Sequence, residues 1–89
     1  MKTILVTGGA GFIGSNFIPF FLKNNQKYKL VNLDLLTYAG DLQNLSELKA
    51  NSNYTFKKGD ICDRSLIEKL FEKYNFSNVI HFAAESHVD

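Results

Sequence analysis

Residues 3–14 read Thr-Ile-Leu-Val-Thr-Gly-Gly-Ala-Gly-Phe-Ile-Gly, and this stretch decides the fold. Its first five residues form an apolar, β-branched run that favours a strand buried on both faces. The glycines that follow allow a tight turn and a close approach of the backbone to a ligand. Residues 9–14 fit the pattern G-x-G-x-x-G, and Gly8, Gly11 and Gly14 also recur at every third position. The stretch therefore predicts a strand, a glycine turn and the start of a helix.

Beyond this turn, helical and strand-like patterns alternate along the chain. Residues 12–24 carry most of their apolar side chains along one side at helical spacing, and residues 28–34 form an apolar strand that ends in an acid. Leucines at positions 42, 45 and 48 predict a short second helix, and residues 54–58 alternate as a half-exposed strand. Ser65 and Glu68 have capping-box spacing at the start of a third helix, whose apolar stripe runs to Tyr74. Residues 79–84 predict the fourth strand.

The predicted order of elements is βαβαβαβ. Because strand–helix–strand crossovers are right-handed, this order gives a parallel sheet. We expect a Rossmann-type, doubly wound α/β fold of which the chain is the first half, with strand order 3-2-1-4. At 89 residues the chain is long enough for one small domain and too short for two.

The carboxyl ends of these strands predict a dinucleotide site. A helix that begins after a glycine turn presents free N–H groups to a diphosphate. Asp34 follows Gly14 by about 20 residues, where a carboxylate accepts hydrogen bonds from both adenosine ribose hydroxyls and repels a 2′-phosphate. No Lys or Arg lies between Asp34 and Lys49, so the sequence favours NAD over NADP. An ordinary glycine turn and a solvated turn aspartate are the competing interpretations.

Two further strand ends face the same crevice. Asp60 and Ile61 offer an acceptor for the adenine amino group beside an apolar contact, although an aspartate that caps a turn would look the same. Ala83 and Ala84 leave room for a cofactor against the backbone, and small core residues are the alternative explanation. His81, inside the predicted fourth strand, is interpreted as a hydrogen-bonded core or interface histidine and not as a ligand.

Composition excludes several classes of protein. The net charge of +1, with acidic and basic residues interleaved, argues against a nucleic-acid partner and a polybasic membrane anchor. The first apolar run stops at Thr7, too early for a signal peptide or a membrane span.

Cys62 is the single cysteine, so an internal disulfide or a cysteine zinc site is impossible. Ser86, His87 and Asp89 lie on an extended segment and cannot converge, so we expect no catalytic triad and no metal site. A cytoplasmic protein is expected.

Together with two further motifs, residues 7–14 resemble the extended short-chain dehydrogenase/reductase superfamily and, within it, the dTDP-glucose 4,6-dehydratases. The motifs are Asp34-Leu35-Leu36-Thr37-Tyr38-Ala39-Gly40 and Ala83-Ala84-Glu85-Ser86-His87-Val88-Asp89. The resemblance covers the chain end to end but only the N-terminal quarter of the family. Leu35 departs from the Lys that often follows the acid, which puts one adenosine contact in doubt.

The resemblance implies a cofactor, a substrate and a reaction. The family's reaction passes a hydride from C4 of the glucose of dTDP-glucose to NAD, eliminates water across C5 and C6, and returns the hydride to C6. The deoxysugar feeds cell-surface polysaccharides, and members are typically homodimers. Ser86 would also touch the sugar nucleotide. The implied cofactor-binding residues are Gly8, Gly11, Phe12, Ile13, Gly14, Asp34, Leu35, Leu36, Thr37, Asp60, Ile61, Phe82, Ala83, Ala84, Glu85 and Ser86.

The family's catalytic Tyr-x-x-x-Lys pair lies beyond the fourth strand. Tyr54 and Lys58 match that spacing, but on a strand they would be about 13 Å apart, so they are not interpreted as catalytic. The predicted fourth strand would be an exposed apolar edge, which proteins normally cover. We therefore expect a fragment of a longer enzyme that has no dehydratase turnover alone. The alternatives are another extended dehydrogenase, such as a UDP-sugar 4-epimerase, and a binding-only dinucleotide module.

Overall fold

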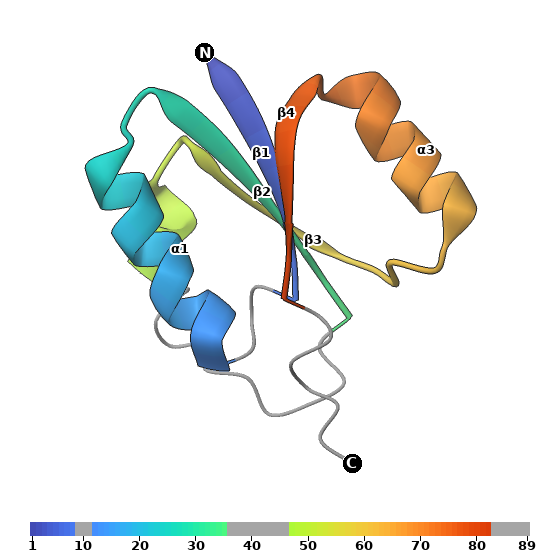
Figure 1. The fold of residues 1–89 in the computed structure, drawn as a ribbon, viewed down its shortest axis with the longest axis horizontal. Helices are drawn as coiled ribbons and strands as arrows, with labels where there is room; N and C mark the ends of the chain where they lie inside the picture. Colours follow the sequence, from blue (N-terminus) through green and yellow to red (C-terminus); the bar gives the residue numbers. More distant parts are fainter. Residues whose placement is uncertain (9–11, 36–46, 83–89) are drawn as a thin grey trace.

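The computed structural model describes residues 1–8, 12–35 and 47–82, along which strands and helices alternate. The predicted bounds of the first helix and of the second and third strands are confirmed, and the first strand is one residue longer. The helix predicted at 42–48 lies mostly outside the described residues. The elements, labelled as in Figure 1, are β1 (Lys2–Thr7), α1 (Phe12–Asn24), β2 (Tyr28–Asp34), the 3-10 helix η1 (Glu47–Ala50), β3 (Tyr54–Lys58), α3 (Arg64–Lys73) and β4 (Phe76–His81).

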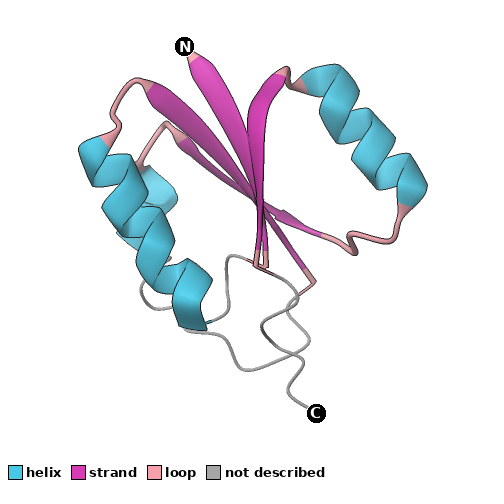
Figure 2. Ribbon diagram, in the orientation of Figure 1, coloured by secondary structure: helices cyan, strands magenta, loops and turns pink. Residues whose placement is uncertain are grey.

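All strands of the sheet are parallel and lie in the order β3-β2-β1-β4. This arrangement confirms the predicted α/β class and the first half of a Rossmann-type sheet. Helices α1 and η1 lie on one face of the sheet and α3 lies on the other, as Figure 2 shows. The helices change face because the chain crosses from β3, at one edge, to β4, at the other.

The face covered by α1 holds the first of two apolar clusters. Alternate residues of β1 and β2 point to this face and meet the buried side of α1. The rings of Phe17 and Phe82 lie 5.4 Å apart and close the cluster near the carboxyl end of β4. Its buried members are Ile4, Val6, Ile18, Leu22 and Leu30.

The opposite face holds the second cluster beneath α3. Leu5, Val31 and Leu33 of the sheet are buried against Leu70 of the helix. Leu66, Ile67 and Tyr74 of the predicted stripe also pack here, which confirms most of the apolar face of that helix. Phe71, the remaining residue of the predicted stripe, is 49% exposed.

The start of α3 differs from the capping box that the sequence predicted. Asp63 is the N-cap residue, and its side chain accepts the N–H of Leu66 at 3.2 Å. Ser65 instead lies within the first turn. Both Asp and Ser are good N-caps, and Asp63 already supplies the bond to the third helical residue, so the spacing of Ser65 and Glu68 was misleading.

Strand β4 begins at Phe76, three residues earlier than predicted. Ser77 and Asn78 are polar, and the sequence analysis expected an apolar strand. An edge strand exposes side chains that an interior strand would bury, so polar residues can occupy it. Phe76 anchors this end of the strand, since its ring centroid lies 5.1 Å from that of Phe71. Val79 is 52% exposed, in keeping with the expected edge position. The strand ends at His81, so Phe82 of the predicted strand lies just outside it. Residues 83 and 84 lie outside the described residues.

Candidate functional site

The carboxyl ends of all described strands meet at one edge of the sheet and are tied together by backbone hydrogen bonds. The N–H of Phe82 donates to the carbonyl of Thr7 at 2.7 Å, and the N–H of Gly8 donates to the carbonyl of Leu33 at 3.0 Å. A third bond, from the N–H of Gly59 to the carbonyl of Asp34, measures 3.1 Å. These bonds extend the pairing past the ends of β1, β3 and β4.

Residues 9–11 of the predicted glycine turn lie outside the described residues, but Gly8, which follows β1 directly, is described. Its φ is 72°, a conformation that costs residues with a Cβ about 1–2 kcal/mol. After the turn, α1 begins at Phe12 at the same edge of the sheet (Figure 1), and its first turn carries no acidic side chain. Its free N–H groups and its dipole therefore favour an anion there. Ile13 is exposed and Gly14 is buried, whereas Gly11 lies outside the described residues.

Asp34 ends β2 next to this turn, as predicted. The residue is only 3% exposed, while Leu35, which follows it, is exposed. The carbonyl of Leu33, the residue before Asp34, is the group that holds the N–H of Gly8. The structure thus brings the start of the glycine turn and the acidic strand end together. Leu36 and Thr37, the other predicted ribose contacts, lie outside the described residues.

The sequence analysis missed a buried polar pair between β2 and β3. Its member on β2, Asn32, lies two residues before Asp34 and therefore on the same face of that strand. Asn32 is 0% exposed, and its side-chain N–H donates to the hydroxyl of Tyr54 on β3 at 3.2 Å. Burial raises the pKa of Tyr54 above its ordinary value of 10.0; the bond from Asn32 lowers it in part, and the charge of Asp34 raises it further. The available signal was an asparagine within an otherwise apolar strand, where burial requires a partner.

Asp60 and Ile61 follow β3, where an adenine contact was predicted. One carboxylate oxygen of Asp60 accepts the N–H of Cys62 at 2.8 Å, and its carbonyl accepts the N–H of Asp63 at 2.9 Å. Asp60 therefore caps a turn, which was the competing interpretation. Ile61 is exposed. The adenine contact stays a prediction.

His81, at the end of β4, is hydrogen-bonded as predicted. Its ring Nδ1 pairs with the hydroxyl of Thr7, which is 1% exposed at the end of β1. The ring is exposed, so the core location was wrong, and only the satisfied hydrogen bond is confirmed. Phe82 is half-buried against α1, and residues 83–86, predicted to follow the cofactor, lie outside the described residues.

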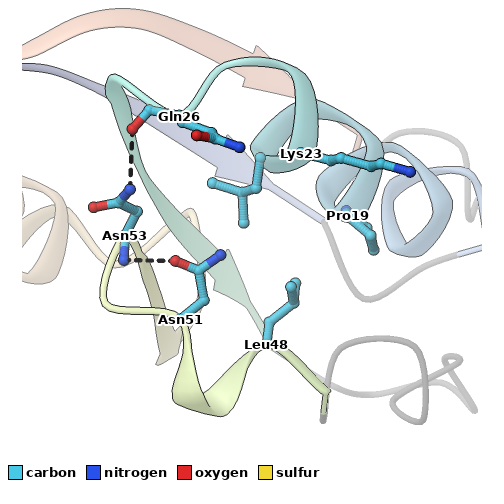
Figure 3. Close-up of a pocket in the computed structure, with 7 residues that line it drawn as sticks. Pro19, Lys23, Gln26, Leu48, Asn51 and Asn53 are labelled. Atoms are coloured by element: carbon cyan, nitrogen blue, oxygen red, sulfur yellow. Dashed lines mark hydrogen bonds between the residues drawn. The ribbon is translucent and has the colours of Figure 1, made fainter.

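A pocket of ≈ 450 Å³ lies at the opposite edge of the sheet, near the amino ends of β2 and β3. Figure 3 shows the hydrogen bond from the side chain of Asn53 to the carbonyl of Gln26, at 3.2 Å, beside this pocket. None of the predicted cofactor residues that the structure describes lines it. Within residues 1–8, 12–35 and 47–82 there is no group of three or more potential metal ligands, and no helix is long and apolar enough to span a membrane.

Comparisons with known proteins agree with this architecture. A family model described as GDP-mannose 4,6 dehydratase matches residues 5–89. The dTDP-glucose 4,6-dehydratase of Salmonella typhimurium is 51% identical over 86 residues, which are 97% of this chain and 24% of that protein. A structure of the Bacillus anthracis dTDP-glucose 4,6-dehydratase in complex with NAD has a TM-score of 0.89 and 44% identity, covering 97% of this chain and 28% of that one.

A second enzyme class shares the fold at lower similarity. The UDP-glucose 4-epimerase of Thermotoga maritima, solved with UDP-glucose, has a TM-score of 0.77 and 35% identity. The match covers 96% of this chain and 25% of the epimerase. The chain thus spans about a quarter of the length of the relatives that it matches.

Proposed function

Because the chain belongs to the GDP-mannose 4,6 dehydratase family, we propose that it is the NAD-binding part of an enzyme that converts dTDP-glucose to dTDP-4-keto-6-deoxyglucose. The observation that carries the proposal is the bond from Gly8, at a φ of 72°, to the carbonyl of Leu33, which precedes Asp34. This bond supports the proposal because it brings the start of the glycine turn next to a strand end that carries an acid, the combination found in dinucleotide sites.

The described residues fit the cofactor. The first turn of α1, at Phe12 and Ile13, would hold the diphosphate through backbone N–H groups, and Asp34 would hold the adenosine ribose. When bound, NAD supplies reversible acceptance of a hydride from the sugar. The remaining contacts follow the family motifs: Gly11 and Gly14 at the diphosphate, Leu35, Leu36 and Thr37 at the ribose, Asp60 and Ile61 at the adenine, Phe82, Ala83, Ala84, Glu85 and Ser86 along the cofactor, and Ser86 also at the sugar nucleotide.

Asp34 also explains the proposed preference for NAD. Its carboxylate is almost fully buried at the strand end, so the 2′-phosphate of NADP would meet a fixed negative charge with little water to screen it. The proposal extends to a homodimeric, cytoplasmic enzyme that supplies a deoxysugar for polysaccharides.

The test compares NAD and NADP binding by calorimetry in the full-length protein. We expect Asp34→Asn to weaken NAD binding about tenfold, the equivalent of one charge-assisted hydrogen bond, and to reduce the discrimination against NADP. Asp60→Asn is the matched control, because it removes the same charge at the same sheet edge but should leave the ratio of the two affinities unchanged. Equal affinities of the unmodified protein for NAD and NADP would refute the assignment.

Turnover separates the alternatives. Proton NMR monitors the reaction of dTDP-glucose with the full-length protein. Formation of a 4-keto-6-deoxy product would support the proposed dehydratase activity. A change of configuration at C4 without loss of water would indicate a 4-epimerase, the class represented by the Thermotoga maritima structure. Tight NAD binding with neither product would indicate a binding-only module.

A further inference from the structure

Thr7 connects β1 to β4 through both its backbone and its side chain. Its carbonyl accepts the N–H of Phe82 at 2.7 Å, and its hydroxyl pairs with Nδ1 of His81, 74 residues away in sequence. Thr7 is 1% exposed, so water cannot replace the imidazole as the partner of its hydroxyl. An unpaired hydroxyl buried at this position would be destabilising.

The Thr7–His81 pair lies where the order of the strands reverses. Strand β1 lies between β2 and β4, and the strand order reverses there, because β2 and β3 lie on one side and β4 on the other. Ligands of open α/β sheets bind at the carboxyl ends of the strands at such a reversal. The side chains of Thr7 and His81 therefore join the two strands at the point where the proposed cofactor site opens.

The next residue in the chain shows what the pair can control. Gly8 follows Thr7 directly and begins the glycine turn, with its N–H held by the carbonyl of Leu33 on β2. The start of the turn is thus fixed on one side by β2 and, through Thr7, on the other side by β4. Loss of the side-chain bond between Thr7 and His81 would weaken only the second of these connections, because the backbone bond from Phe82 to Thr7 would stay in place.

We propose that His81 is a positioning residue for the cofactor, which acts through the Thr7 hydroxyl to fix the direction in which the glycine turn leaves β1. The inference rests on the proposed NAD binding. A second bond that a side chain makes between the same two strands, at their amino ends, offers a control: the Ser77 hydroxyl donates to the backbone carbonyl of Thr3 at 3.3 Å. That bond joins β4 to β1 far from the turn.

The experiment measures NAD affinity and unfolding free energy in the full-length protein. Thr7→Val keeps the shape of the side chain and removes the hydroxyl, and His81→Phe removes the ring nitrogen. We expect each to weaken NAD binding about fivefold, the equivalent of one hydrogen bond, and the double variant to be no weaker than either single variant. Thr7→Ser, which restores the hydroxyl, should bind as the unmodified protein does. Ser77→Ala should lose stability without losing NAD affinity.

Three results would overturn the inference: unchanged NAD affinity in Thr7→Val, additive losses in the double variant, or an equal loss in Ser77→Ala. Hydrogen exchange at the Gly8 amide gives a second readout that needs no cofactor. Exchange should accelerate in Thr7→Val and His81→Phe but not in Ser77→Ala. If the unmodified protein fails to bind NAD, the proposed function is wrong, and unchanged Gly8 exchange in Thr7→Val would then refute the positioning role separately.

Discussion

Tyr54→Phe removes the hydroxyl of Tyr54 and leaves its ring in place, so it isolates the hydrogen bond that Asn32 donates at 3.2 Å. Asn32 is 0% exposed, and water cannot reach the N–H that loses its acceptor. The loss of one hydrogen bond by a buried side chain costs about 0.5–3 kcal/mol. Removing the hydroxyl also removes the cost of burying a polar group in the folded state. We therefore expect the free energy of unfolding to fall by about 1–2 kcal/mol.

The effect depends on pH in a direction that the surroundings of Tyr54 determine. Burial, with a smaller contribution from the charge of Asp34, raises the pKa of Tyr54 above 10.0. Above about pH 10 the unfolded chain loses the phenolic proton while the folded chain keeps it. The folded state then binds more protons, so this contribution to stability is complete below pH 10 and declines as the pH rises further. Tyr54→Phe has no phenolic proton to lose, so its stability lacks this decline. The difference in unfolding free energy between the unmodified protein and Tyr54→Phe should therefore narrow above pH 10.

Urea unfolding followed by circular dichroism, at about pH 8 and about pH 11, measures both effects. Tyr28→Phe is the matched control, because Tyr28 is also half-buried and contributes a ring contact with Phe21 at 5.4 Å that the substitution keeps. Tyr28→Phe should change the free energy of unfolding by less than Tyr54→Phe. Equal losses in the two variants at pH 8, or a gap that widens above pH 10, would refute the account of the Asn32–Tyr54 pair.

Three further predictions concern the turn, the helix cap and the core. Gly8→Ala should lower the free energy of unfolding by about 1–2 kcal/mol in urea titrations because its φ is 72°, and a neutral result would show that the turn relaxes. Asp63→Ala should lower the free energy of unfolding by about 1 kcal/mol because it removes the cap of α3, whereas Ser65→Ala should lower it much less. The opposite ranking in thermal unfolding would show that Ser65 is the cap. Leu70→Ala should cost about 2–5 kcal/mol because its side chain is 3% exposed, and the half-exposed Phe71 should tolerate alanine better; equal losses on urea unfolding would contradict the assigned faces of α3.

The interior strands and the first helix were predictable because their signals are local. The run before Gly8 and the helical spacing after it each report on a few consecutive residues, and the right-handed crossover rule then leaves few strand orders to consider. The acid at position 34 was predictable for the same reason, since its distance from the glycines follows from one strand–helix–strand unit.

The elements that were mispredicted lie where two local signals compete. Asp63 and Ser65 both satisfy the residue preference of a helix cap, and only the folded backbone shows that Asp63 accepts the N–H of Leu66. At Asp60 two signals also coincide: its bond to Cys62 shows the turn, and the adenine contact stays a prediction. The start of β4 was not predicted because polar residues follow Phe76. Which side chains of a strand are buried depends on whether the strand lies at the edge of the sheet, and local sequence does not report that position.

The sequence alone thus determined the order of the elements, the parallel sheet and the glycine turn ahead of an acidic strand end, since periodicity and chain chirality act over short distances. The tertiary structure alone decided which side chains meet across the sheet: Asn32 with Tyr54, 22 residues apart, and Thr7 with His81, 74 residues apart. The physical reason is register. Thr7 stands opposite His81, whereas Tyr54 stands opposite Leu30 and reaches Asn32 two residues further along β2. Both bonds depend on how the strands are aligned, and that alignment exists only after the sheet has formed.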